Sequence, residues 1–392
     1  MARNITTGID IGTYQVKVVV TELFKENGKN IPRILGTGIA ESKGLRHGYI
    51  INTDDVTESV AQAVAQAEKA SSTQIKRAYI SVGGVGLSGV ISIGQTVVSR
   101  ADLEISELDL AKVGDACEAE IPPALIQNRR ILHAIPVSYK IDSKVVLGNR
   151  PLGMRGSKLE AKMLFITCLE PHLADLMYAV DRAGIEVIDV LASPIAASVV
   201  TLTKAQKIAG CVLANIGAET ISLVVYENNI PISLEVFPIG STDITHDIAL
   251  GLKVPIEEAE NIKMGVVTQT SVSRKKLDEI VNARLSDMFE LIEAHLKKIG
   301  RNGMLPGGIF ISGGGSGIGT IEDFAKASLK LPSKIAQINL GEKSRIGDST
   351  WSVAYGLCMV GFSKDTQADI GIKGSTQDAF KKVFSWFKQF LP

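Results

Sequence analysis

Residues 8–20 place one carboxylate and a tight glycine turn between two apolar runs. The order is Gly8-Ile9-Asp10-Ile11-Gly12-Thr13, followed by Tyr14 to Val20, and it predicts a strand, a turn and a second strand. Glycine lets a backbone come close to a ligand, so the N–H groups of such a turn can point at a phosphate. Asp10, at the end of the first strand, is placed to meet a metal ion bound to that phosphate. An ordinary β-turn accounts for this motif equally well when it is considered alone.

The same pattern returns in the second half of the chain. Asn215-Ile216-Gly217-Ala218-Glu219-Thr220 precedes a second apolar run, Ile221 to Val225. Asp10 corresponds to Asn215 and Gly12 to Gly217, an offset of roughly 205 residues. Two copies of a phosphate hairpin predict two related halves that face each other across one nucleotide.

Composition limits the class of protein. At 392 residues the chain is long enough for two lobes or several subdomains. Apolar residues make up 45% of the chain and charged residues 21%, which is typical of a soluble α/β protein. The 42 basic and 42 acidic residues cancel, so no overall charge favours nucleic acid as a partner.

The cysteines and the N-terminus favour a cytosolic protein. Four scattered cysteines form no metal-binding pair, so we expect reduced core thiols. The first residues have no apolar signal core. No apolar run approaches the ~18 residues of a membrane-spanning helix. We therefore expect a protein that stays in the cytosol and does not cross a membrane.

Apolar periodicity predicts a mixed α/β order, an inserted unit and then a second α/β lobe. Beyond the two hairpins, strands are expected at 32–39, 77–82, 90–98, 133–141, 159–169 and 186–191 and through 239. Helices are expected after Asn52 and Ser106, from Pro171 and Ser193, and at 241–252, 255–264, 273–298 and 349–362.

These elements divide the chain into two lobes, each interrupted by a subdomain, and a tail. The expected parts, with subdomain names that the family resemblance described below implies, are a first lobe (1A) at 1–86 and 164–208, an inserted subdomain (1C) at 87–163, a second lobe (2A) at 209–241 and 306–362, a helical subdomain (2B) at 242–305, a polar linker at 363–376 and an amphipathic helix at 377–392.

Together these features resemble the actin, heat-shock chaperone and sugar-kinase ATPase superfamily. The resemblance rests on the two hairpins, the glycine-rich turn Ile311 to Gly319 and the Ala-rich helix start Ser193 to Ala197. Within it, the whole chain resembles the FtsA family of bacterial cell-division proteins, through the insertion with its Pro151 to Gly156 segment, the Gly240 to Ala249 segment and the amphipathic end. This implies a two-lobed actin-like ATPase fold with duplicated RNase H-like sheets, an SHS2-like insertion and a C-terminal amphipathic helix.

The resemblance also implies that ATP and Mg²⁺ lie between the lobes. The two hairpins would hold the phosphates from opposite sides, the glycine-rich turn would pass under the adenosine, and Asp10 would meet Mg²⁺ through water. The residues assigned in this way are Asp10, Gly12, Thr13, Tyr14, Lys17, Asn215, Gly217, Ala218, Glu219, Thr220, Gly240, Glu260 and Lys263 (the last two near ribose and base), and Gly313, Gly314, Gly315 and Ser316.

Asn215 departs from the superfamily pattern, which has Asp at this position of the second hairpin. An amide supplies a dipole rather than a charge, which weakens the positioning of metal and water. We therefore expect nucleotide binding through backbone contacts, with weak or absent hydrolysis. No Ser-His-Asp or Cys-His pattern in the sequence offers another catalytic site.

The last residues form an amphipathic pattern at helical period. Docking on the protein's own core is one interpretation, but a polar linker before the helix and a chain end after it favour a helix that lies on a membrane surface. In the FtsA family this element is the membrane anchor, which implies contact with anionic lipid. The assigned residues are Phe380, Lys381, Lys382, Val383, Phe384, Trp386, Phe387, Lys388, Phe390 and Leu391.

The resemblance implies a protein that polymerises on the cytoplasmic side of the membrane at the division site and tethers the ring of the tubulin-like protein FtsZ. The FtsZ C-terminal tail would bind subdomain 2B, with Arg274 and Arg284 as contacts for that acidic peptide; solvated helix charges explain these arginines equally well. The insertion would contact neighbouring subunits or later division proteins. Two alternatives stay open: a small-metabolite kinase, which needs a substrate-base Asp, and a pilus-assembly adaptor, for which this terminal helix is not expected.

Overall fold

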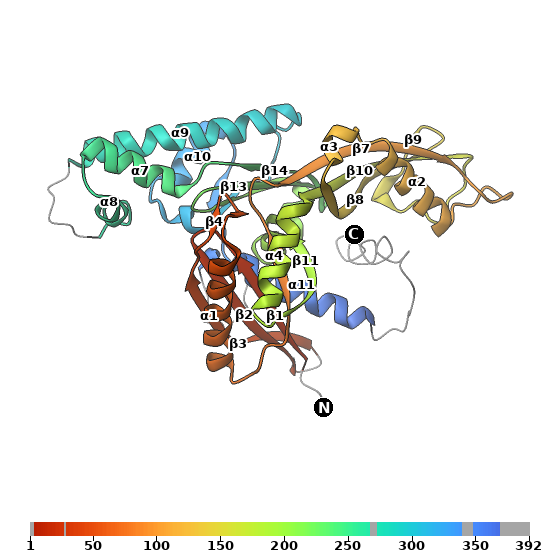
Figure 1. Ribbon diagram of the computed structural model, residues 1–392. Coiled ribbons are helices and arrows are strands. Elements are labelled where there is room, and N and C mark those ends of the chain that lie inside the picture. Colours follow the sequence, from red (N-terminus) through yellow and green to blue (C-terminus); the bar gives the residue numbers. More distant parts are fainter. Residues whose placement is uncertain (1–3, 27–28, 267–272, 339–347, 369–392) are drawn as a thin grey trace.

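Two five-stranded sheets with the same strand order form the centre of the protein (Figure 1). The computed structural model describes residues 4–26, 29–266, 273–338 and 348–368. The first sheet has the order β3-β2-β1-β6-β11 and the second β14-β13-β12-β15-β16. In each, the first three strands along the chain pair antiparallel and the last two add in parallel. The duplication predicted from the two hairpins is therefore present in the fold.

The bounds of these elements follow the apolar pattern closely. The strands of the two sheets are β1 Ile5–Ile11, β2 Gln15–Glu26, β3 Lys29–Glu41, β6 Arg77–Val82, β11 Glu186–Ala192, β12 Cys211–Ile216, β13 Ile221–Glu227, β14 Ile230–Phe237, β15 Gly308–Ser312 and β16 Ser333–Ile335. The helices are α1 Thr53–Ser71, α4 Glu170–Arg182, α5 Ser193–Thr201, α6 Lys204–Ala209, α7 Ser241–Leu252, α8 Ile256–Lys263, α9 Arg274–Lys298, α10 Ile321–Leu329 and α11 Ser352–Ala368.

Helix α1 shows how local sequence sets these bounds. The Asn52 side chain accepts hydrogen bonds from the backbone N–H groups of Asp54 and Asp55, so the helix begins at the expected cap. Its buried stripe packs on β3, where a Cβ on Gly38 would lie 1.9 Å from the carbonyl oxygen of Ala63. Only glycine allows helix and strand to approach so closely.

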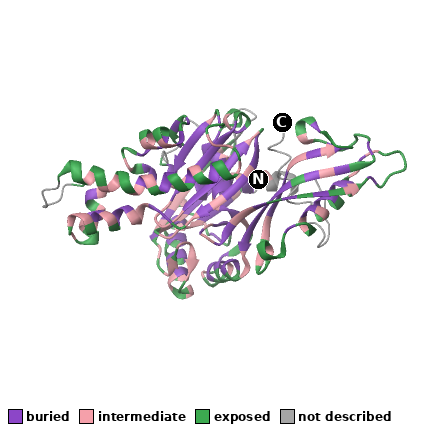
Figure 2. Cartoon of the chain, turned by 90° about the horizontal axis from the view of Figure 1, so that it is seen from above, coloured by how far each residue is buried: buried purple, intermediate pink, exposed green. Residues whose placement is uncertain are grey.

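Helices α5 and α11 join the two halves. Helix α11, from the second half of the chain, packs on β1, β2 and β6 of the first sheet, while α5, from the first half, contacts β12 and β13 of the second. The two helices also pack against each other, and a Cβ on Gly356 would lie 1.9 Å from the carbonyl oxygen of Ala196. Each half of the chain therefore contributes a helix that packs against the sheet of the other half. Figure 2 shows the buried residues concentrated in the central strands.

The insertion is a separate four-stranded antiparallel sheet with the order β7-β10-β8-β9, covered by α2. Its elements are β7 Leu87–Val97, α2 Glu107–Ala119, α3 Pro123–Ile126, β8 Arg129–Ile141, β9 Lys144–Val145 and β10 Lys158–Leu169. Strand β10 runs without a break past residue 163, so the boundary expected there falls inside a strand. At the base, the Arg129 side chain donates to the Gly86 carbonyl oxygen and to the Ser88 and Thr167 hydroxyls, which holds the two connecting strands together.

The end of the described chain corrects one expectation. Residues 363–368 were expected to begin a polar linker, but α11 continues through them to Ala368. This stretch, Ser363-Lys-Asp-Thr-Gln-Ala, is polar yet contains no glycine or proline, so nothing in it stops a helix. The remaining linker and the expected membrane-binding residues from Phe380 to Leu391 lie outside the described residues.

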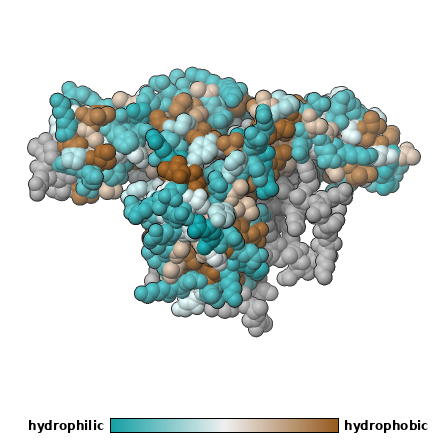
Figure 3. Space-filling model, viewed as in Figure 1, coloured by the Kyte–Doolittle hydropathy of each residue, from teal (hydrophilic) through white to brown (hydrophobic). Residues whose placement is uncertain are grey.

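The surface in Figure 3 is largely hydrophilic, with apolar residues in separate groups. Within the described part of the chain, the helices are all too short or too polar to span a bilayer.

Candidate functional site

The two predicted hairpins have the same turn geometry. The Gly12 N–H donates to the Gln15 carbonyl oxygen at 3.2 Å, and the Gly217 N–H donates to the Thr220 carbonyl oxygen at 2.8 Å. A Cβ would lie 3.1 Å from Gln15 O at Gly12 and 3.2 Å from Thr220 O at Gly217, so a side chain at either glycine would crowd its turn. The repeated motif therefore encodes a repeated structure.

The first hairpin carries a charged pair. Asp10 on β1 lies opposite Lys17 on β2, and the Ser81 hydroxyl from β6 donates to Asp10 Oδ1 at 2.8 Å. Although part of Asp10 is accessible, the surrounding protein removes water from its carboxylate and raises its pKa, while Ser81 and Lys17 act in the opposite direction. A cation that approached this carboxylate would therefore relieve an electrostatic cost.

Lys17 connects this hairpin to the end of the second half of the chain. Its Nζ donates to the Thr350 carbonyl oxygen at 3.1 Å and lies 5.8 Å from the centre of the Trp351 ring. Both residues belong to the short 3₁₀ helix η3 Ser349–Trp351. Burial lowers the pKa of Lys17, although Asp10 and Asp348 favour its charged form.

The second hairpin has no such pair. Asn215 lies opposite Ser222 on β13 and next to Ser312 on the parallel strand β15. Ser312 is fully buried and its hydroxyl has no hydrogen-bond partner among the described residues. The backbone positions match those of the first hairpin, while Asn215, Ser222 and Ser312 are neutral.

The glycine-rich turn after β15 packs directly on Asn215. Gly313 has φ +87°, and a Cβ there would lie 2.3 Å from Asn215 Oδ1 and 2.5 Å from the Ile216 carbonyl oxygen. A Cβ on Gly314 would meet nothing within 4 Å. The Ser316 hydroxyl donates to Gly313 O at 2.7 Å and lies 3.3 Å from the Ser349 hydroxyl, beside the η3 turn that binds Lys17. The fold thus brings the first hairpin and the glycine-rich turn to the same turn, η3.

Helix α7 begins against the second hairpin. The Ser241 N–H donates to Gly217 O at 2.9 Å and the Thr242 N–H to Ala218 O at 2.8 Å. A Cβ on Gly240 would lie 2.2 Å from Ala218 O, so this expected site residue is a position where the backbone comes too close for a side chain. These two hydrogen bonds therefore fix the N-terminus of α7 to the turn of the second hairpin.

Glu260 and Lys263 hold the first turn of α7. Lys263 Nζ donates to Ser241 O at 3.1 Å and to the Thr245 hydroxyl at 2.8 Å, and it lies 2.7 Å from Glu260 Oε2. The Thr245 hydroxyl donates to the same carboxylate oxygen at 2.5 Å. The Lys263 side chain is only 10% exposed, so these residues form a half-buried network rather than a solvated pair of charges.

Glu219 does not direct its carboxylate to its own hairpin. Oε2 accepts a hydrogen bond from the His47 backbone N–H in the first lobe, and the Glu219 carbonyl oxygen lies 3.2 Å from His47 Nδ1. A carboxylate turned towards its own turn would repel a phosphate, so in this orientation the backbone N–H is the group of Glu219 that suits the predicted phosphate contact.

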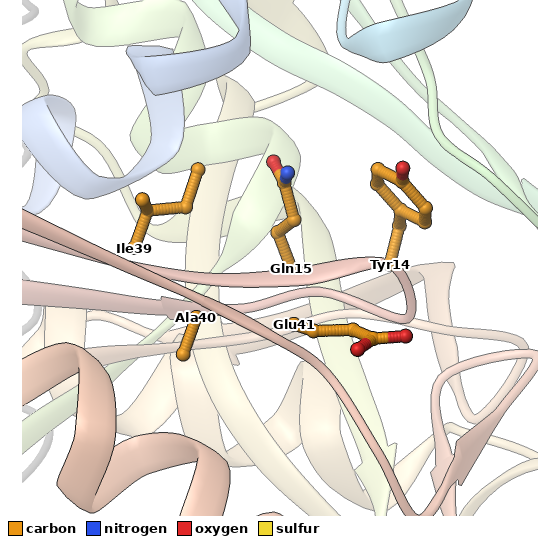
Figure 4. Close-up of a pocket in the computed structure, with 5 residues that line it drawn as sticks. All are labelled: Tyr14, Gln15, Ile39, Ala40 and Glu41. Atoms are coloured by element: carbon orange, nitrogen blue, oxygen red, sulfur yellow. The ribbon is translucent and has the colours of Figure 1, made fainter.

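Tyr14, at the tip of the first hairpin, is 61% exposed. It borders a depression of about 260 Å³ with Gln15, Ile39, Ala40 and Glu41. Figure 4 shows Tyr14, Gln15 and Ile39 projecting to the same side of the strands. All five residues belong to the first lobe, so this depression lies beside the hairpin rather than between the two hairpins.

The two arginines expected to bind a peptide differ. Arg274, the first residue of α9, is exposed. Arg284 donates to both carboxylate oxygens of Asp247 on α7, at 2.6 and 3.0 Å, and to Asp287 at 3.2 Å, and its side chain is 28% exposed. An acidic peptide would have to compete with Asp247 for Arg284.

No cluster of three or more His, Cys, Asp or Glu side chains that could bind a metal occurs in the described part of the chain. The donor set at the first hairpin is instead one carboxylate beside backbone amides. This set suits Mg²⁺ that arrives with a nucleotide and keeps most of its ligands from phosphate and water.

Comparison with known proteins identifies the family. The chain is 31% identical to the cell division protein FtsA of Borreliella burgdorferi, over 92% of this chain and 91% of that protein. This chain belongs to the FtsA family. FtsA of Pseudomonas aeruginosa is 27% identical, over 94% of this chain and 92% of its own length. The family model described as cell division protein FtsA matches residues 212–356, and the model described as the SHS2 domain inserted in FtsA matches residues 84–167.

Solved structures agree with an actin-like fold for this FtsA-family chain. A chain of the PilM-PilN type IV pilus biogenesis complex superposes with a TM-score of 0.66 at 16% identity, covering 91% of this chain and 98% of that one. MreB5 of Spiroplasma citri bound to AMPPNP gives a TM-score of 0.55 at 12% identity, covering 94% and 99%. At these identities the likeness concerns the fold alone. The predicted two-lobed actin-like fold and the predicted family are confirmed.

Sequence reasoning missed several residues at the site. Ser81, Ser312, His47 and Thr350 each lie beside a predicted residue, but each arrives from a different element. Ser81 and Ser312 lie at or next to the last residue of their strands, and a parallel pairing of those strands with β1 and β12 would have been the signal that placed them. No sequence signal placed His47 or Thr350.

Proposed function

We propose that this FtsA-family protein binds ATP with Mg²⁺ between its two hairpins and that nucleotide-bound subunits assemble into actin-like filaments beneath the cytoplasmic membrane at the division site. The observation that carries the nucleotide site is the pair of hairpins with matching turn geometry, one of which is tied through η3 to the glycine-rich turn. The solved structures of MreB5 bound to ADP and to AMPPNP, on a similar fold, support a nucleotide as the ligand.

The residues divide the binding task between backbone and side chains. Backbone N–H groups at Gly12, Thr13, Tyr14 and at Gly217, Ala218, Glu219 approach phosphate oxygens from two sides. The bound Mg²⁺ neutralises phosphate charge. Asp10 faces that charge through water, and its ionised form becomes less costly because a cation then lies beside it.

Hydrolysis is slow in this proposal. Asn215 and Ser222 are neutral where the first hairpin has Asp10 and Lys17, and the Glu219 carboxylate of the second hairpin accepts a hydrogen bond from the His47 N–H instead of facing its own turn, so no carboxylate occupies the Asp10 position there to take a proton from water. Calorimetric titration with ATP, with and without Mg²⁺, tests binding, and steady-state phosphate release tests turnover. We expect Mg²⁺-dependent binding with turnover below ~1 per second; absence of binding would contradict the site, and faster turnover would contradict the role of Asn215.

The same assay separates the kinase alternative. A kinase would transfer the terminal phosphate to a sugar or another small metabolite, with release of ADP that depends on that acceptor. We expect ADP release to be unchanged by a panel of sugars and polyols.

Membrane attachment is proposed for the amphipathic segment at 377–392. One helix with seven apolar side chains and three lysines gives modest affinity for an anionic surface, at about 1 kcal/mol per lysine. Many helices on one filament multiply that affinity. Sedimentation with anionic liposomes should show binding that rises steeply with assembly and disappears for Trp386→Glu or for a chain that ends at Thr376. A simple hyperbolic curve, unaffected by conditions that block assembly, would mean that one helix suffices.

Tethering of the FtsZ ring is proposed through the FtsZ C-terminal tail on subdomain 2B. Arg274 is exposed for such a contact, while Arg284 is held by Asp247. Arg284→Glu should weaken binding of a tail peptide and leave ATP affinity intact. Asp247→Asn provides the matched variant: it frees Arg284 from a competing charge, so it should strengthen peptide binding. Equal affinity in both variants and the parent would remove Arg284 from the site.

The insertion is proposed to contact neighbouring subunits or later division proteins rather than nucleotide. Its two ends meet, because the Leu169 N–H donates to Gly86 O at 3.2 Å, so residues 87–168 can be replaced by a short glycine link. The shortened chain should keep ATP binding and lose assembly. Loss of both would show that the insertion is part of the first lobe. The insertion also packs closely on the second lobe, because a Cβ on Gly89 would lie 2.8 Å from Leu234 O of β14, so its removal could disturb the lobes.

A further inference from the structure

We propose that His47 is a positioning residue that ties the second phosphate hairpin to the first lobe, so that the affinity for the terminal phosphate of a nucleoside triphosphate depends on it. The inference rests on the proposed nucleotide site. It assigns a role to a residue that contacts no phosphate itself and acts through Glu219.

His47 sits at a constrained position. The strands β4 Leu45–Arg46 and β5 Tyr49–Ile50 are joined by the two residues His47 and Gly48, both with positive φ, at +48° and +83°. This is the pattern of a type I′ hairpin turn, in which asparagine or glycine is the favoured first residue. The turn itself therefore tolerates histidine at this position but does not select it over asparagine or glycine.

Contacts with the second lobe supply a reason. The His47 backbone N–H donates to the Glu219 carboxylate, and the His47 ring Nδ1 lies 3.2 Å from the Glu219 carbonyl oxygen. The two contacts therefore involve both the side chain and the main chain of Glu219. Glu219 lies within the hairpin turn, between Gly217 and Thr220, whose hydrogen bond closes that turn.

The β4–β5 turn is in turn fixed to the first hairpin's own sheet. The Val85 N–H donates to His47 O at 3.2 Å, and a Cβ on Gly48 would lie 2.3 Å from Gly84 Cα, so the turn lies flat on the end of β6. Strand β6 also carries Ser81, which donates to Asp10. A continuous set of contacts therefore runs from Asp10 through β6 and His47 to Glu219, and it sets the position of one hairpin relative to the other.

This arrangement predicts discrimination between triphosphate and diphosphate. If both hairpins contact the terminal phosphate, their fixed spacing increases the binding affinity for ATP. A diphosphate contacts fewer of the turn amides, so its affinity increases less. Loss of the His47 contacts should therefore raise the Kd for ATP by roughly three- to tenfold, the effect of one or two hydrogen bonds, and the Kd for ADP by less.

The turn geometry allows matched variants. His47→Gly removes the ring and still suits a type I′ turn. His47→Asn also suits the turn and keeps a short donor near the position of Nδ1, so it should restore the affinity lost in His47→Gly. Glu219→Ala removes the acceptor for the His47 N–H, and Glu219→Gln keeps a neutral acceptor there.

The measurement is calorimetric titration of each full-length variant with ATP and with ADP in the presence of Mg²⁺, alongside thermal unfolding without nucleotide. We expect His47→Gly and Glu219→Ala to lower the ratio of ADP Kd to ATP Kd, and His47→Asn and Glu219→Gln to recover most of it, at similar unfolding temperatures. If the parent binds ATP and all four variants keep its ratio within twofold, the role of His47 is wrong and the nucleotide site stands. If the parent binds neither nucleotide, the proposed function fails as well.

Discussion

The two hairpins of this protein share one backbone and differ in their charges. At the first, Asp10 faces Lys17 and accepts a hydrogen bond from Ser81. At the second, Asn215 occupies the place of Asp10, Ser222 that of Lys17, and Ser312 that of Ser81, and within the described part of the chain the Ser312 hydroxyl has no hydrogen-bond partner. Both copies keep the tight turn whose backbone amides suit the proposed phosphate contacts. Only the first copy has a carboxylate opposite a lysine on its paired strands, so the two copies differ in the charges beside a shared turn.

The difference also changes how each site is held together. The first hairpin is positioned by side chains, since Ser81 and Lys17 connect it to β6 and η3. The second depends more on backbone, since α7 donates two N–H groups to it and Gly313 packs against Asn215, while His47 and Glu219 connect it to the first lobe. We therefore expect substitutions at the first hairpin to change stability and binding mainly by altering charge, and substitutions at the second mainly by steric clash.

The largest expected effect comes from adding a Cβ to the second site. Gly313→Ala places a methyl group against Asn215 Oδ1 at a left-handed φ, so it should cost about 2–5 kcal/mol in the free energy of unfolding and abolish ATP binding. Gly314→Ala is the matched control, because its Cβ meets nothing within 4 Å. Denaturant unfolding and ATP titration of both variants check this. Equal stability of the two variants would contradict the packing argument.

Removing the charge at the first site should have opposite effects on binding and stability. Asp10→Asn should weaken Mg²⁺-dependent ATP affinity by about 10–100-fold, by analogy with the loss of outer-sphere metal partners. It should also raise the unfolding temperature of the nucleotide-free protein at pH 7, because the raised pKa of Asp10 means that its ionised form is disfavoured in the fold.

The sign of the pH dependence follows from that shift. A carboxyl whose pKa is raised by folding favours the folded state below its unfolded value of 3.8, and that contribution is lost as pH rises through the folded pKa. The difference in unfolding temperature between Asp10→Asn and the parent should therefore become smaller as pH is lowered towards about 4. A gap that widens in acid would reverse the assignment.

Making the second hairpin resemble the first is the converse experiment. Asn215→Asp adds a carboxylate where Ser222 replaces a lysine, so we expect a lower unfolding temperature at pH 7 without nucleotide. With ATP and Mg²⁺ present, steady-state phosphate release should rise by about 100-fold, the lower end of the range for a positioned general base. Unchanged turnover would show that Asn215 is not what limits hydrolysis.

The smallest expected effect separates the two serines. Ser81→Ala removes a donor to Asp10 and should cost about 1 kcal/mol in the free energy of unfolding. Ser312→Ala removes a buried hydroxyl that has no partner among the described residues, so it should be neutral or slightly stabilising. Denaturant unfolding of both variants measures the difference, and equal losses would mean that the two sites are more alike than their hydrogen bonds indicate.

The sequence by itself determined the local and repeated features of this protein. Glycines at fixed places in two hairpins, the Asn52 cap and the apolar periods of strands and helices depend on neighbours in the chain, so the duplicated fold and its two matching turns could be predicted. Polar composition alone did not stop α11 at residue 363, because helix ends need a breaking residue rather than a polar one.

Tertiary structure decided which distant groups complete the site. Ser81 reaches Asp10 because β6 adds in parallel beside β1, and Lys17 meets Thr350 because α11 returns from the far end of the chain to cover the first sheet. His47 contacts Glu219 because the β4–β5 turn of the first lobe lies against the second hairpin, which belongs to the other lobe. These contacts join residues 71, 333 and 172 positions apart, and a local pattern cannot encode partners whose proximity arises only when the sheets and helices pack.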